Sequence, residues 1–206
     1  MSLELWLAFA IASSALLAVP GPTVMIVVSY ALGKGRSSAW ATVPGVALGD
    51  LTAMTISLLG AGAILAASAT LFTAVKIAGA IYLVWLGIQL WRSPPSLSAL
   101  TANRVNAGTG RMFWNCYVVT TLNPKGLVFF IAFVPQFIEQ DAPLIPQFII
   151  LIATFVILGA ANVVIWALLA SEMRARFQRQ STLRLANRIG ASFLIGAGVL
   201  TALARR

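Results

Sequence analysis

Two hydrophobic stretches of this chain are interrupted by proline, and they occupy corresponding places in its two halves. The first interruption is AVPGPT at residues 18–23, and the second is TLNPKG at residues 121–126. Proline inside a helix removes a backbone donor and clashes with the preceding turn. In a membrane, the freed backbone groups are tolerated only where they face protein or a water-filled cavity. The pair therefore predicts two broken helices, and such a pair is the best sequence indication of a transporter's binding site.

The composition indicates an integral membrane protein. Of the 206 residues, 60% are hydrophobic and only 9% are charged, whereas soluble domains carry about 25% charged residues. The net charge of +9 does not predict nucleic-acid binding, because the basic residues lie in short loops rather than on one folded face. The chain has no histidine and only five acidic residues, so we expect neither a metal site nor a cofactor.

Six segments have, or nearly have, the length of about 20 apolar residues that a membrane helix needs. They are residues 5–30, 39–66, 71–91, 113–137, 147–170 and 189–204, and an earlier start of the short sixth segment, near Leu185, is the alternative. We therefore predict an all-α integral membrane protein with six transmembrane helices, of which the first and the fourth are broken by proline.

The basic residues gather on one side of this arrangement. The loops after the first, third and fifth segments hold two, three and five lysines and arginines, which makes ten of the 14 in the chain. The fourth loop is acidic, with Glu139 and Asp141. Cytoplasmic loops carry the excess of lysine and arginine. We therefore expect the basic loops in the cytoplasm and both termini on the periplasmic side.

The third and sixth segments align without gaps. GAIYLVWLG at residues 79–87 matches GASFLIGAG at residues 190–198. Small residues also serve helix packing in general, but the proline breaks of the first and fourth segments correspond as well. Because three crossings are an odd number, the two halves run in opposite directions, as inverted repeats do. We predict two three-helix repeats, at residues 1–91 and 113–206, joined by a cytoplasmic linker at residues 92–112.

Several unusual residues lie at one depth. Counted from the cytoplasmic ends of their segments, the depth is roughly 16 Å for Asp50, roughly 18 Å for Lys125, and about 12–15 Å for Pro22, Asn123 and Asn162. Charges at such depth are costly, and they face a cavity or pair with each other. Two interpretations remain open: a structural ion pair between Asp50 and Lys125, or a functional site that contains both.

These residues offer the chemistry that a zwitterionic amino acid requires. A helix that starts after Pro22 would present free N–H groups and a positive dipole end to a carboxylate. Lys125 could add to carboxylate binding, and Asp50 could bind the ammonium group. The expected substrate-binding residues are Pro20, Gly21, Pro22, Gly49, Asp50, Asn123, Pro124, Lys125 and Asn162.

Asp50 is also the candidate for proton coupling. It is the only carboxylate at this depth, because the other acidic residues, Glu4, Glu139, Asp141 and Glu172, lie near aqueous ends. Burial favours its neutral form, whereas Lys125 or a bound ammonium group favours its charged form. Proton and substrate would therefore compete at one group, as antiport requires.

The chain as a whole resembles the LysE/RhtB family of bacterial amino-acid exporters. The matching residues are Pro20-Gly21-Pro22, Gly45, Gly49-Asp50, Lys76 with residues 79–83 and Gly87, and Asn123-Pro124-Lys125. Pro22-Thr23 resembles the threonine/homoserine branch, whereas the lysine/arginine branch tends to have Gly-Pro-Gln-Asn here. The resemblance implies a protein of the bacterial inner membrane that exports neutral amino acids or derivatives, driven by the proton gradient.

Other functions match the sequence less well. Export of another small solute or of a divalent metal would use the same architecture, but the lack of histidine and acidic clusters disfavours a metal. A non-transporting membrane subunit would not need charges at this depth. An enzyme is not expected, because Ser57 or Ser68 could pair with Lys76 but no third residue recognisably orients such a pair. The expected partners are an amino-acid substrate, protons and the lipid bilayer, and a homodimer would suit so small a chain.

Overall fold

The computed structural model describes residues 1–67, 69–92, 107–139, 141–172 and 180–203, and every regular element in these ranges is a helix. The prediction of an all-α chain is confirmed for this part. Most of the predicted linker lies outside these ranges, as do Ser68 and the side chain of Lys76.

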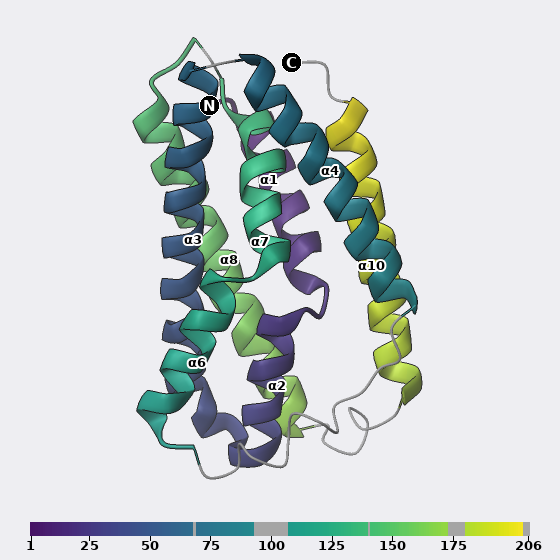
Figure 1. The fold of residues 1–206 in the computed structure, drawn as a ribbon. Helices are drawn as coiled ribbons and strands as arrows, with labels where there is room; N and C mark the ends of the chain where they lie inside the picture. The colour runs from purple at the N-terminus through teal and green to yellow at the C-terminus, as the bar shows by residue number, and fades with distance from the viewer. Residues whose placement is uncertain (68, 93–106, 140, 173–179, 204–206) are drawn as a thin grey trace.

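The helices lie side by side in an elongated bundle (Figure 1). The start of α1 (Leu3–Ala18) and the end of α10 (Gln180–Leu203) lie at one end of the bundle, which we call the terminal end. The turn after α2 (Pro22–Lys34) lies at the opposite end, which we call the linker end, and α4 (Ala69–Arg92) runs from the terminal end toward it.

The first predicted break separates α1 from α2. Helix α1 ends at Ala18, and α2 begins at Pro22 after an extended Gly21. Proline suits the first position of a helix, because the N–H that it lacks would have no intrahelical acceptor there. The sequence PGP thus ends one helix and starts the next.

The second predicted break separates α6 (Thr109–Thr121) from α7 (Pro124–Val128), and proline again starts the second helix. Asn123 caps α7, since its side-chain oxygen accepts a hydrogen bond from the backbone N–H two residues later at 3.1 Å. The chain continues as a π-helix, η2 (Phe129–Phe133), and a 3-10 helix, η3 (Val134–Phe137). Both breaks therefore lie where the sequence predicts them.

The other long helices are α3 (Ala39–Ala67) and α8 (Leu144–Glu172). Helix α3 follows α2 through a turn at Gly35, whose φ of +68° lies in the left-handed region that glycine tolerates. Pro44 lies inside α3 without ending it. Helix α10 begins at Gln180, earlier than the segment predicted from residue 189, because the helix continues into polar residues that a search for apolar segments passes over.

Glycines bring α3 close to α6. A Cβ on Gly45 would lie 2.6 Å from the Phe113 carbonyl oxygen, and one on Gly49 would lie 2.8 Å from the Thr120 Cβ. These distances are too short for any larger residue without a shift of the helices. The pattern is the close packing that small residues four positions apart allow.

The contact between α4 and α10 is reciprocal. A Cβ on Gly87 would lie 2.9 Å from the Ala191 carbonyl oxygen, and one on Gly198 would lie 2.6 Å from the Ala80 carbonyl oxygen. The alignment of the two segments makes Gly87 equivalent to Gly198 and Ala80 equivalent to Ala191. Equivalent residues thus make equivalent contacts across the helix pair, as they do about a twofold axis.

Three helical stretches in the described part are long and apolar enough to cross a membrane: Pro22–Gly60, Thr109–Phe137 and Leu144–Glu172. Shorter apolar helices are Leu3–Ala18, Ile77–Gln89 and Leu194–Leu203. The chain thus has apolar helices of the kind found in membrane proteins, and the number of crossings stays a prediction.

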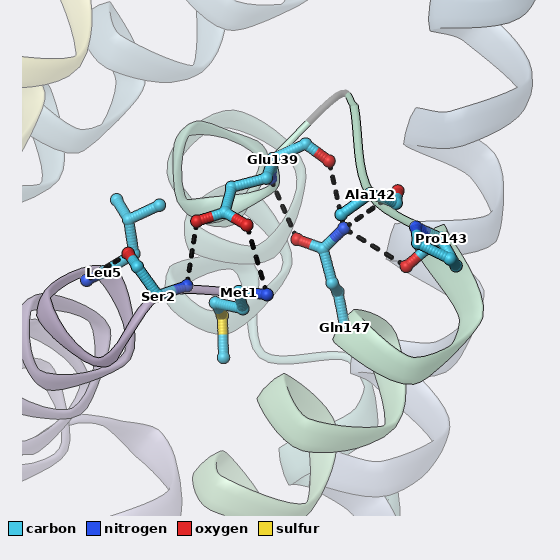
Figure 2. A network of polar contacts seen from close by, with 7 residues as sticks. All are labelled: Met1, Ser2, Leu5, Glu139, Ala142, Pro143 and Gln147. Atoms are coloured by element: carbon cyan, nitrogen blue, oxygen red, sulfur yellow. Dashed lines mark hydrogen bonds and ion pairs between the residues drawn. The ribbon is translucent and has the colours of Figure 1, made fainter.

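A polar network joins the start of the chain to the loop before α8 (Figure 2). The Glu139 carboxylate accepts a hydrogen bond from the Ser2 N–H at 2.8 Å and lies 3.1 Å from the Met1 ammonium. The buried Gln147 amide bonds both the N–H and the carbonyl of Glu139, at 2.9 and 3.0 Å. The Ser2 N–H, followed by the ammonium, holds the pKa of Glu139 below its usual value. Glu139 is therefore charged at neutral pH, and its carboxylate then contacts both Met1 and Ser2.

Candidate functional site

Two apolar clusters fill the bundle, one on each side of its middle. The linker-side cluster consists of apolar residues of α2, α3, α6 and α8, among them Val46 and Val163. The terminus-side cluster is built from α1, α3, η2 and α8 and includes Ala53 and Phe155. On α3 the boundary falls between Val46 and Ala53, and on α8 it falls between Phe155 and Val163. A polar layer lies between the clusters.

A small cavity occupies this layer. Its volume is about 30 Å³, which is enough for about one or two water molecules. The predicted site residues that line it are Gly21, Asp50, Asn123, Lys125 and Asn162. They come from α3, α8 and both helix breaks, so the structure brings together residues that are more than 100 positions apart in the sequence.

The other predicted residues do not line the cavity. Pro20 is buried beside it, and Pro22 and Pro124 are exposed on the bundle. Gly49 lies in the contact between α3 and α6 described above. A proline interrupts a helix through its own backbone, so its ring need not point toward the groups that the interruption exposes.

The Lys125 ammonium is buried and bonds the end of α1. Its Nζ donates to the Leu16 carbonyl at 3.0 Å and to the Val19 carbonyl at 2.9 Å. These bonds use two of the three donors of an ammonium group. Among the ion pairs of the described residues there is none between Lys125 and Asp50, so the structural ion pair that the sequence left open is not formed.

Amide and hydroxyl groups complete the polar layer. Asn162 donates to the Leu17 carbonyl at 3.0 Å. Asn123 and Thr120 both donate to the Thr23 hydroxyl oxygen, at 3.2 Å each. Each break is therefore bonded to residues of the other half of the chain.

Asp50 differs from its neighbours in the layer. It is 7% exposed, and its Oδ2 has no hydrogen-bond partner within the described ranges. A Cβ on Gly159 would lie 2.7 Å from this oxygen, so the carboxylate lies where α8 has no side chain. A buried carboxylate oxygen without a donor is costly. It therefore marks the place where a ligand that donates hydrogen bonds would fit.

The start of α2 has no side-chain cap. Gly21 occupies the cap position and has no side chain that could bond the first N–H groups of the helix. Thr23 and Val24 of the first turn line the cavity together with Gly21. Free N–H groups and the positive end of a helix dipole attract an anion. The cavity thus combines a carboxylate with a positive helix end.

Nine further residues line the cavity that the sequence did not predict there, among them Thr23, Phe155 and Gly159. Gly159 had a usable signal, because it precedes Asn162 by three residues and must share its helix face. Thr23 directly follows the break and could have been included with it. Phe155 carries no signal, since it is one apolar residue among many in α8.

Comparisons with known proteins agree with one another. The model of the family described as LysE type translocator matches residues 14–205. A homoserine/homoserine lactone efflux protein of Salmonella typhimurium is 30% identical over 205 residues, which cover 100% of this chain and 99% of that protein. An uncharacterized membrane protein of Vibrio cholerae is also 30% identical, over 100% of both chains. A leucine efflux protein of Salmonella choleraesuis is 28% identical over 125 residues, 61% of this chain and 59% of that protein. No solved structure matches the chain.

Proposed function

The chain belongs to the LysE family of translocators, and we propose that it exports small neutral amino acids or their derivatives from the cytoplasm. One observation carries the proposal: the unpartnered carboxylate oxygen of Asp50 and the uncapped start of α2 line the same cavity. A zwitterion would offer its ammonium group to the first and its carboxylate to the second.

The site residues then have separate roles. Asp50 binds the substrate ammonium, and the third donor of Lys125 adds to carboxylate binding at the start of α2. Asn123 and Asn162 hold the two breaks in place through their bonds to Thr23 and Leu17. The remaining predicted residues act through the backbone: Pro20, Pro22 and Pro124 form the breaks with Gly21, and Gly49 sets the distance between α3 and α6.

The chemical character of the cavity lining favours a substrate with a neutral side chain. Besides the zwitterion-binding groups, the walls are apolar, with Leu16, Val24 and Phe155, and Thr23 supplies one hydroxyl. The relatives named for homoserine, homoserine lactone and leucine support substrates of the threonine or homoserine type.

For the whole chain we propose six transmembrane helices in two inverted repeats, residues 1–91 and 113–206, joined by the linker at residues 92–112. The reciprocal contact between α4 and α10 supports the inversion. The protein would lie in the bacterial inner membrane with both termini in the periplasm, because the basic loops belong on the cytoplasmic side.

Coupling to protons would use Asp50. Substrate ammonium arriving from the cytoplasm displaces the proton from the carboxylate, and a proton arriving from the periplasm displaces the substrate. The competition needs a carboxylate that forms no direct ion pair with a protein cation, and the Lys125 ammonium is hydrogen-bonded to α1 instead.

The test uses the purified chain in proteoliposomes, with labelled leucine, homoserine and lysine measured both in counterflow and under a proton gradient. We expect transport of the two neutral amino acids. Asp50→Asn should abolish gradient-driven transport and leave residual counterflow, whereas the control Glu139→Gln, at the terminal end, should retain both. Full proton-driven export by Asp50→Asn would contradict the carrier role, and transport of none of the three would contradict the substrate class.

A further inference from the structure

The end of α1 presents carbonyl groups that can accept bonds from elsewhere, because the last four carbonyls of a helix lack the usual intrahelical donor. The Leu16 carbonyl already accepts one bond, from the Val19 N–H at 3.2 Å, and a carbonyl can accept two. Three of the carbonyls at this end, on Leu16, Leu17 and Val19, accept hydrogen bonds from side chains. The donors are Lys125 and Asn162, at distances of 2.9 to 3.0 Å. Both donors belong to the second half of the chain, so one half caps the broken helix of the other.

The position of Lys125 in its own helix does not explain this arrangement. It is the second residue of α7, where the helix dipole is positive and disfavours a cation. Its ammonium lies instead at the end of α1, where the dipole is negative and favours one.

Gly21 leaves room for the Lys125 side chain. A Cβ on Gly21 would lie 3.3 Å from Nζ and 3.4 Å from Cε of Lys125, which is closer than most such contacts. The central glycine of the PGP sequence therefore serves two purposes: it allows the close approach of Lys125, and it lies in the break between α1 and α2.

Backbone carbonyls at the end of an interrupted helix are the groups that coordinate sodium in other transporters with broken helices. We propose that the Lys125 ammonium is a built-in cation at the α1 break, which takes the place of a bound sodium ion. The break is then stable, and substrate moves, without Na⁺ from the medium. The inference goes beyond the export function, because it predicts the stability of the protein in the absence of any substrate.

The first experiment removes the built-in cation and offers a soluble one. Lys125→Ala deletes the atoms that n-propylammonium contains, and its melting temperature is measured on the full chain in detergent. We expect a lower Tm than the wild type in choline chloride. Saturating propylammonium, or Na⁺, should raise the Tm of the variant by about 3 °C or more, while tetramethylammonium, which has no N–H donor and is too large, should not.

Lys34→Ala is the matched control. Lys34 Nζ also donates to a backbone carbonyl, that of Ala107, but it does so at the linker end. Its variant should show no specific response to propylammonium. An equal response in both variants, or no response in Lys125→Ala, would overturn the proposal.

Two measurements decide the matter if Lys125→Ala does not fold. Lys125→Met keeps the volume and loses the charge, so it should have a low Tm that no added cation restores. A Tm equal to that of the wild type would refute the need for a cation.

The wild type should have the same Tm, and the same transport rate in proteoliposomes, in sodium and in choline salts at equal pH gradient. A Tm that depends on Na⁺ would overturn the proposal even if the chain exports no amino acid.

Discussion

Each charged group of the polar layer lies against a glycine on another element. The Asp50 carboxylate lies beside Gly159 of α8, and the Lys125 ammonium lies beside Gly21 at the first break, where added Cβ atoms would lie 2.7 and 3.3 Å away. Neither contact is a hydrogen bond or an ion pair, yet each charged group occupies space that a side chain at the glycine would fill. At the scale of residues, the site is therefore determined by absent side chains as much as by polar ones.

Gly159→Ala should displace the Asp50 carboxylate and slow export. The added methyl group would meet the flexible end of a side chain, which can move, so we expect the protein to fold. Moving a binding group by about 1 Å can cost up to 100-fold in rate, and we expect a loss of roughly tenfold or more. The measurement is the initial export rate in membrane vesicles, normalised to the amount of protein.

Gly126→Ala is the control for this change. Gly126 lines the same cavity, but its added Cβ would make only an ordinary contact, 3.5 Å from the Phe130 ring. It should export at nearly the wild-type rate. Equal rates for the two variants would mean that the position of the carboxylate does not matter for export.

At the scale of elements, the sequence predicts the breaks well and their partners poorly. Proline acts on the backbone of its own helix, so a local pattern suffices to place the ends at Ala18 and Thr121. The partner of Lys125 is a different matter, because Leu16 and Val19 are apolar residues that contribute only carbonyls. Nothing in their side chains marks them, and the sequence therefore offered Asp50 as the one possible partner of Lys125 while leaving the pair open.

Because proline acts on the backbone of its own helix, the two prolines that start α2 and α7 lead to a prediction. Pro22→Ala and Pro124→Ala each restore a backbone N–H, which allows the preceding helix to continue and removes the free N–H groups at the break. We expect export to fall by about tenfold, with a smaller fall in the amount of folded protein in the membrane. Pro44→Ala is the matched control, since α3 passes through Pro44 without a break. Normal export by Pro22→Ala and Pro124→Ala would show that the breaks serve packing alone.

For the whole molecule, the orientation proposed above rests on the basic loops. The basic loops are known from the sequence alone, and the ends of the helices are known from the structure (Figure 1). Helix α2 ends with Lys34 at the linker end, whereas Glu139 is bonded to Met1 and Ser2 at the terminal end. The number of crossings could not be read from length and hydropathy alone, because the breaks divide apolar segments and α10 extends into polar sequence.

Labelling of single cysteines would test this orientation. Cys116 is buried, and Cys116→Ala provides a background without cysteine. On it, Asp141→Cys and Thr109→Cys place a thiol at an exposed position of the terminal end and of the linker end. A membrane-impermeant maleimide should label the first in intact cells and the second only after the membrane is permeabilised, because basic loops stay in the cytoplasm. The reverse pattern would mean that the protein is inserted in the opposite orientation. Substrate and proton would then approach Asp50 from the opposite sides, and the direction of export proposed here could not hold. Labelling of both positions from one side would instead rule out an odd number of crossings between residues 109 and 141, and with it the inverted repeat.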